Sequence, residues 1–172
     1  MRLAAAVSAL VLIFATAAAA DPVALAPISF SPEFQTEVDE TLGAREGDYL
    51  RRDVERQVVR ALQRRGVTVE ANAPVTIEVS VVDAEPNRPT LEQATHQPGL
   101  DIFRSVSVGG AELHAVLRGA GGEALVEVDH SYYTNSLGEL WGSPSTWTDA
   151  NRSISRFANK VADAYVALTV NR

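Results

Sequence analysis

The sequence predicts an α+β two-layer sandwich, in which two helices cover one face of a mostly antiparallel sheet of about four strands. Segments 49–65 and 146–168 repeat apolar residues at helical spacing. Segment 75–81 alternates apolar and polar residues, as a half-buried strand does. Segment 111–133 has two alternating halves around a glycine-rich turn, which is typical of a β-hairpin. With a first strand at 23–30, the predicted order is β-α-β-β-β-α.

The N-terminal segment has the features of a secretory signal peptide. Arg2 precedes an apolar run that ends in Ala18–Ala20, an A-x-A cleavage site before Asp21. The competing interpretation, a transmembrane anchor, is disfavoured because the run is rich in alanine and no basic cluster follows it. We therefore expect a signal peptide at 1–20 and a single α+β domain at 21–172.

The amino-acid composition indicates where the protein is located and which classes of partner it does not bind. The chain has no cysteine, so it lacks the residue that carries a lipid anchor. Removal of the predicted signal peptide leaves 14 basic against 22 acidic side chains, a formal charge of -8. An acidic chain does not suit nucleic acid, which requires a basic footprint. We expect a periplasmic or secreted protein with no nucleic-acid partner and no stable membrane anchor after cleavage.

The first half of the domain is predicted as strand, loop, helix and strand. Pro27 lacks an N–H, so the strand at 23–30 suits an edge or a bulge. Residues 31–48 are expected to form a loop with at most one turn of helix. Asp48 is the expected N-cap of the helix at 49–65. A right-handed crossover would then place 75–81 parallel to the first strand.

The outer face of this first helix is basic within an acidic protein. It carries Arg51, Arg52, Glu55, Arg56 and Arg60. We expect this face to be solvated, with Glu55 partly paired with Arg51 or Arg52.

Residues 83–110 form a long connection that contains three prolines. Loops of this length in compact domains are uncommon and are usually functional, disordered or partly structured. Within it we expect a short helix at 90–96 and a strand at 102–108. This loop is the first place to look for a ligand.

Matching apolar faces predicts the register of the hairpin. Leu113, Ala115 and Leu117 are expected opposite Val128, Val126 and Ala124. The other face then pairs Glu112 with Asp129, His114 with Glu127, Val116 with Leu125 and Arg118 with Glu123. Such a mixture of charged and apolar pairs indicates a partly covered face.

No catalytic, cofactor or metal motif is found. Asp129, His130 and Ser131 are the residue types of a hydrolase triad, but consecutive side chains of a strand point to opposite faces. His130 is therefore expected as a hydrogen-bonded histidine at the rim of the core face. The three histidines lack metal-ligand spacing, and an acidic calcium site around Glu112 and Asp129 is a minor alternative.

The order of segments resembles small uncharacterised periplasmic domains of unknown function from Gram-negative bacteria. The resemblance rests on the signal peptide, the strand and basic helix, the segments TIEVSVVDAEPNRPT and VGGAELHAVLRGAGGEALVEVDHSYY, and the final helix TWTDANRSISRFANKVADAY. The layout is also similar to envelope assembly lipoproteins, which implies helices on one sheet face. The missing anchor cysteine departs from that group.

These observations favour a non-catalytic envelope protein that uses no cofactor and no metal. It would bind a partner protein or an envelope component through the open sheet face and the loop at 83–110. A homodimer through an edge strand is a further possibility. The candidate contact residues are Arg88, His96, Asp101, Arg104, Glu112, His114, Val116, Leu125 and Glu127.

The alternative is a small hydrolase-like periplasmic enzyme, because functional polar residues often lie on loops held by a rigid scaffold. Its acids and arginines would be Asp83, Glu85, Arg88, Asp101 and Arg104.

Overall fold

The structure is a computed structural model that describes residues 20–135 and 145–170. The predicted signal peptide lies outside this part of the chain except for Ala20, the first residue of β1. The elements in chain order are β1 (Ala20–Leu25), β2 (Ser29–Phe30), α1 (Pro32–Glu37), the π-helix η1 (Val38–Leu42), α2 (Ala44–Gln63), β3 (Val67–Val69), β4 (Thr76–Glu85), α3 (Leu91–His96), β5 (Gly110–Arg118), β6 (Ala124–Tyr133) and α5 (Thr148–Val170).

The protein has the predicted α+β class, but its sheet is mixed and has six strands rather than about four. The strand order is β3-β1-β4-β5-β6, and β2 also pairs with β4. The crossover places β4 parallel to β1, as predicted. Two further parallel pairs, β1 with β3 and β2 with β4, were not predicted. The three residues of β3 are too few to show an alternating pattern in the sequence.

The predicted first strand is divided in two. Leu25 lies opposite Ile77 of β4 and Ser29 lies opposite Ser80, so β1 and β2 together contain one residue more than their partner. Pro27 lies in the interruption, where its missing N–H leaves no ladder hydrogen bond unmade. The proline, expected at an edge or a bulge, lies instead at a break between two strands.

The segment at 31–48 is helical rather than a loop. Ser31 caps α1 by accepting a hydrogen bond from the Phe34 backbone N–H at 3.1 Å. Gly43, with φ of 94°, then separates η1 from α2. Because α2 begins at Ala44, Asp48 lies inside the helix and is not its N-cap.

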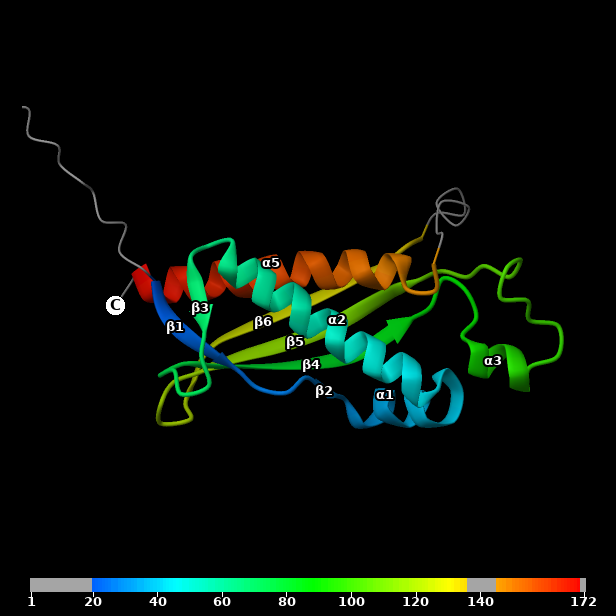
Figure 1. Cartoon of the computed structure of the whole chain (residues 1–172), viewed down its shortest axis with the longest axis horizontal. Helices are drawn as coiled ribbons and strands as arrows, with labels where there is room; N and C mark the ends of the chain where they lie inside the picture. Colours follow the sequence, from blue (N-terminus) through cyan, green and yellow to red (C-terminus); the bar gives the residue numbers. More distant parts are fainter. Residues whose placement is uncertain (1–19, 136–144, 171–172) are drawn as a thin grey trace, which may run out of the picture.

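Figure 1 shows α2 and α5 side by side over one face of the sheet, as predicted. Their apolar stripes form one core with Ile77, Val79, Val81 and Ala84 of β4 and the odd-numbered residues 111–117 of β5. The helical and alternating patterns of the sequence predict a core made of Val126 and the residues below, and all of them are buried except Val126, which is half-buried. The buried set from the prediction is Ile28, Leu50, Val54, Val58, Leu62, Ile77, Val79, Val81, Leu113, Ala115, Leu117, Val128, Ile154, Phe157, Val161 and Tyr165.

The hairpin register differs from the prediction by two residues. Leu113 lies opposite His130, Ala115 opposite Val128 and Leu117 opposite Val126. A shift of two keeps every side chain on its predicted face, so matching faces does not distinguish the two registers. The turn determines which of the two registers forms. The Gly122 backbone N–H, at φ of 84°, donates to the Gly119 carbonyl at 2.9 Å, and the strand pairing has a bulge at Leu117/Arg118.

Phe157 is fully buried where α5 packs on the sheet. We expect Phe157→Ala to lower the free energy of unfolding by about 3–5 kcal/mol, because it removes apolar contact and leaves a cavity. Urea unfolding followed by circular dichroism measures this change. Ser155→Ala, at an exposed position of the same helix, is the control and should stay within about 0.5 kcal/mol of the wild type.

Candidate partner-binding surface

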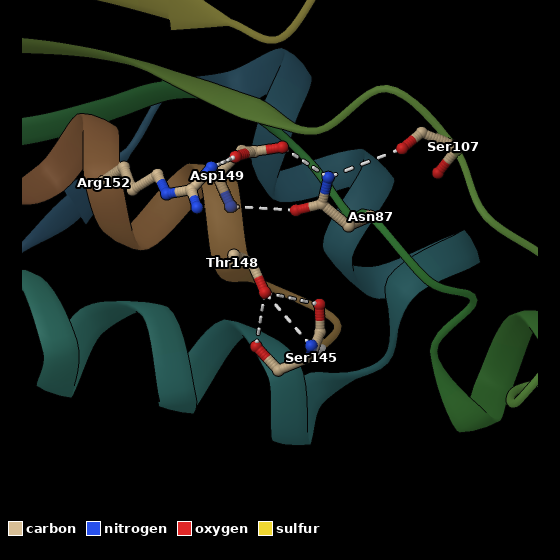
Figure 2. A network of polar contacts seen from close by, with 6 residues as sticks. All are labelled: Asn87, Ser107, Ser145, Thr148, Asp149 and Arg152. Atoms are coloured by element: carbon tan, nitrogen blue, oxygen red, sulfur yellow. Dashed lines mark hydrogen bonds and ion pairs between the residues drawn. The ribbon is translucent and has the colours of Figure 1, made fainter. Parts of the chain in front are cut away.

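The long loop after β4 is anchored to the start of α5 by a buried polar pair, Asn87 and Asp149. Both side chains are 0 % exposed. The Asn87 Nδ2 donates to the Asp149 carboxylate at 2.6 Å, and the Asn87 Oδ1 accepts from the Asp149 backbone N–H at 2.8 Å (Figure 2). One amide thus satisfies a buried carboxylate and one of the backbone donors that a helix N-terminus leaves unpaired.

The backbone of Asn87 is held as firmly as its side chain. Its N–H donates to the Thr146 carbonyl at 2.7 Å, and its carbonyl accepts from the Ser107 N–H at 3.0 Å. The Ser107 hydroxyl donates in turn to the Pro86 carbonyl. Both ends of the loop are therefore tied to each other and to the segment that precedes α5.

Arg152 completes the network from the helix side. Its Nη1 donates to the second carboxylate oxygen of Asp149 at 2.7 Å. A carboxylate in the first turn of a helix is also favoured by the helix dipole. Asp149 is therefore paired on both oxygens, which a fully buried charge requires.

Gly109 leaves space for this anchor. A Cβ at this position would lie 2.4 Å from the Asn87 side chain, a distance that real Cβ contacts do not show. The Gly109 carbonyl accepts from the Thr134 N–H at 2.9 Å, which connects the loop to the end of β6.

Short-range contacts give the rest of the loop a defined shape. The predicted helix at 90–96 is confirmed as α3, which starts with a capping box between Thr90 and Gln93. The predicted strand at 102–108 is wrong, because Asp101 initiates a turn by accepting from the backbone N–H groups of Phe103 and Arg104 at 2.7 and 3.1 Å. A side chain that bonds its own backbone in this way competes with strand pairing.

The anchored loop exposes apolar side chains at the end of the molecule remote from the C-terminal end of α5 (Figure 1). Phe103 is 79 % exposed, Leu91 is 63 % exposed and Val108 is 44 % exposed. Leu91 and Phe103 line a cavity of about 500 Å³, whose wall also contains Arg88, Pro89, Ile102, Ser145 and Thr146. We call Leu91, Phe103, Val108 and this cavity the loop patch.

Of the four candidate contact residues of the loop, Arg88, Asp101 and Arg104 lie around the loop patch. Arg88 lines the cavity and donates from its Nη1 to the Phe103 carbonyl at 2.7 Å. Asp101 and Arg104 are exposed in the turn that presents Phe103. His96 is exposed at the end of α3 and contacts Glu92 at 2.8 Å, away from the cavity wall.

The other five candidates lie on β5 and β6, on the sheet face that α2 and α5 leave uncovered. Glu112 and Glu127 are exposed, and Leu125 is half-buried. Val116 is only 9 % exposed, so little of its side chain is available for contact with a partner. His114 lies opposite Asp129, not opposite Glu127 as predicted, and its Nδ1 is 2.7 Å from the Asp129 carboxylate.

The triad residues are separated as predicted, since His130 lies on the helix-covered side, opposite Leu113. The hydrogen bond expected for His130 is not made by its Nε2, which is buried without a partner among the described residues. Burial, followed by the nearby charges of Lys160 and Arg156, lowers the pKa of His130.

Asp83 and Glu85 of β4 lie near Glu37 of α1 and Tyr133 of β6. The Tyr133 hydroxyl donates to the Asp83 carboxylate. Burial first, and then this hydrogen bond, raises the pKa of Tyr133. Burial also raises the pKa of Glu37 and of Glu85, and the charge of Asp83 adds to both shifts.

This arrangement does not form a catalytic cleft from the five residues of the hydrolase alternative. Asp83 is bonded to Tyr133, and Asp101 is used by its own turn. Glu85 lines a cavity of about 230 Å³ that is separate from the one lined by Arg88. Across the described ranges, no group of three or more His, Cys, Asp or Glu side chains gathers as a metal site would require.

No sequence pattern identifies the residues that anchor the loop. Asn87 and Asp149 are 62 positions apart, and no local pattern connects them. The position of Asp149 in the first turn of a strongly amphipathic helix indicates where the helix starts, but not which distant residue Asp149 contacts. Leu91 and Phe103 are recognisable in the sequence as isolated large apolar residues in a proline-rich loop.

We expect Asn87→Ala to lower the free energy of unfolding by about 2–4 kcal/mol, because it leaves a buried carboxylate and a helix N–H without one of their partners. Urea unfolding measures the loss. Asn72→Ala removes the same side chain from an exposed turn and should change stability by less than about 0.5 kcal/mol. Equal effects of the two substitutions would contradict this assignment.

The raised pKa of Glu85 predicts a pH-dependent effect. A raised pKa means that the folded protein holds a proton on Glu85 more readily than the unfolded chain, so this group's contribution to stability falls as pH rises from about 4.5. We expect Glu85→Gln to raise the melting temperature at pH 7 and to leave it unchanged at pH 4. Thermal melts at both pH values test this, with Glu40→Gln on exposed η1 as the control. A larger gain at pH 4 than at pH 7 would reverse the predicted sign.

No helix in the described part of the chain has the length and apolar content of a membrane span. No curated protein matches the chain. Solved structures with a similar arrangement include a PelC dodecamer from Paraburkholderia phytofirmans, with 12 % identity, 86 % of this chain and 88 % of that chain covered, and a TM-score of 0.47. Protein XCC0632 from Xanthomonas campestris has 12 % identity, coverage of 90 % and 88 %, and a TM-score of 0.40.

Rare lipoprotein B from Shewanella oneidensis has 13 % identity, coverage of 86 % and 94 %, and a TM-score of 0.33. The family model described as "Protein of unknown function (DUF3313)" matches residues 4–161. The expected resemblance to domains of unknown function is confirmed, and the chain belongs to the DUF3313 family.

Proposed function

We propose that the protein is a non-catalytic, exported envelope protein that binds a partner protein through the loop patch, with the open sheet face as the adjoining polar surface. The observation that carries the proposal is Phe103, a large aromatic side chain that is 79 % exposed on an anchored loop. Aromatic residues are enriched among the side chains that dominate protein–protein binding energy.

The anchoring of the loop supports a binding role. An exposed apolar side chain on a flexible loop loses conformational entropy when a partner orders it. Here the Asn87–Asp149 pair and the capping box of α3 hold the loop before any partner arrives. The loop patch therefore has the pre-organisation that reduces the cost of association.

The composition of the patch indicates the kind of partner. Pro89, Leu91, Ile102 and Phe103 provide an apolar wall, and Ser145 and Thr146 provide hydroxyl groups at one side of the cavity. A protein segment that inserts one apolar side chain would fill the cavity, and its backbone would reach the hydroxyl groups. The apolar centre with a polar rim is the usual anatomy of a protein interface.

The open sheet face contributes charge at the other end of the surface. His114 and Asp129 form one cross-strand pair, and Arg118 and Glu78 form another at 2.7 Å. Glu112 and Glu127 make no ion pair among the described residues, which favours a partner with basic groups at this position. Rim charges of this kind act mainly on association rate and specificity.

A partner protein is favoured over a second copy of this chain at the sheet edge. Of the two edges of the sheet, β3 has only three residues, and β6 exposes Glu127 and Asp129. Two β6 strands in antiparallel pairing would bring these like charges together, and like charges opposite each other destabilise a sheet. Charged edge residues are a common means of preventing edge-to-edge association.

The test is site-specific photo-crosslinking in cells that express the full chain. A photo-reactive residue at position 103 should give a crosslinked species of defined mass. The matched control is position 170, since Val170 is 78 % exposed and belongs to the other end of the molecule. Phe103→Ser should reduce capture of the same partner about ten-fold or more in a pull-down, and Val170→Ser should not.

Equal crosslinking at positions 103 and 170 would contradict the proposal, as would unchanged capture by the folded Phe103→Ser variant. A crosslinked species with twice the mass of the chain would identify a homodimer and replace the partner protein by a second copy.

A further inference from the structure

A row of arginines runs along the solvent side of α2. Arg52, Arg56, Arg60 and Arg64 are spaced four residues apart, which places them on one stripe of the helix. Each step corresponds to a rise of about 6 Å along the helix axis. The stripe is basic in a chain with a formal charge of -7.

Three of these arginines line a cavity of about 330 Å³ between α2 and α5. Its wall consists of Asp53, Arg56, Gln57, Arg60, Arg64 and Ser155. Every residue of the wall is polar, so the cavity offers nothing to a lipid chain or an apolar side chain. We call it the arginine cavity.

A buried carboxylate positions the arginine cavity's first guanidinium. Asp53 is 3 % exposed and accepts hydrogen bonds from Arg56 and, at 2.5 Å, from the Gln57 Nε2. At the far end, the Arg64 Nη2 donates to the Asn159 Oδ1 of α5 at 3.3 Å. Two guanidinium groups are thus held by contacts within the protein.

Arg60 lies between them, and its guanidinium makes no hydrogen bond or ion pair with any residue of the described chain. The expected pairing of Glu55 with Arg51 or Arg52 is also not made: Arg51 contacts Asp48 at 3.7 Å and its guanidinium lies 3.9 Å from the centre of the Phe30 ring. Glu55 is not in the wall of the arginine cavity but lines an adjacent surface hollow together with Arg52, Arg56 and Arg60.

The balance of charge in the wall is three arginines against one aspartate, which leaves two positive charges for an incoming ligand. The planar fork of a guanidinium matches the geometry of phosphate oxygens, and such pairs are shorter and stronger than neutral hydrogen bonds. The Ser155 hydroxyl adds a neutral donor on the α5 side. A cavity of this volume accepts a small ligand.

We propose that the arginine cavity binds the phosphate group of a small, water-soluble ligand, with Arg60 as the guanidinium that is free to pair with it. The site lies on the helix layer, so it is separate from the loop patch and does not depend on it. The same chemistry has two sources, free phosphate with its soluble esters and the head groups of anionic lipids, and the fully polar wall favours the soluble source.

The test is isothermal titration of the purified protein with inorganic phosphate and with glycerol 3-phosphate, against sodium chloride at matched ionic strength. We expect saturable binding of a phosphate ligand and a loss of affinity of about ten-fold or more in Arg60→Gln. Because Arg60 is exposed and unpaired within the described chain, this substitution should leave the melting temperature unchanged.

The matched control is Arg45→Gln, which removes the same charge from an exposed position on the same helix outside the arginine cavity. Equal loss of affinity in both variants would show a general effect of net charge and overturn the site. Absence of saturable binding by the wild type at millimolar phosphate would also overturn it. Binding only to vesicles that contain phosphatidic acid, and not to the soluble ligands, would overturn the soluble source.

Discussion

The hydrogen-bonded pair of Asn87 and Asp149 determines the position of the long loop after β4 relative to the start of α5. A fully buried carboxylate is stable only when its oxygens are paired, and the Asp149 oxygens are paired with the Asn87 amide and with Arg152. The same amide caps a backbone donor at the start of α5. If the loop left its position, the Asp149 carboxylate and the backbone N–H at the start of α5 would lose their hydrogen-bond partner. The anchor therefore fixes the position of the loop that exposes the apolar side chains.

The two proposed sites use opposite chemistry in different parts of the fold. The loop patch exposes Phe103 and Leu91 at one end of the molecule, where burial against a partner would remove apolar surface from water. The arginine cavity lies between α2 and α5 and has only polar walls, with Asp53 as its buried support. In both cases a buried polar group supports the site: the Asn87–Asp149 pair anchors the loop, and Asp53 holds Arg56 in the cavity wall. Neither site needs the other for its geometry.

Periodicity was sufficient to predict the α+β class, both long helices, β4 and the hairpin, because each of these elements buries one continuous face. It was not sufficient for β3, which is too short to repeat, or for α1, whose start depends on the Ser31 cap. The hairpin register failed for a related reason. Matching the faces of Leu113 and Ala115 leaves registers that differ by two residues equivalent, and the glycine turn selects between them. The loop remains the region where the sequence predicts a ligand, and its anchor joins residues that are distant in sequence and so leaves no local pattern.

The most direct test of this account is amide hydrogen exchange of the wild-type protein at the two ends of the loop. The Ser107 N–H donates to the Asn87 carbonyl and the Asn87 N–H donates to the Thr146 carbonyl. If the anchor holds the loop, both amides should exchange on the timescale of the β5 amides, because they open only when the domain unfolds. Exchange of both amides at the rate of exposed Gly99 would show that the loop opens independently, and it would contradict the account.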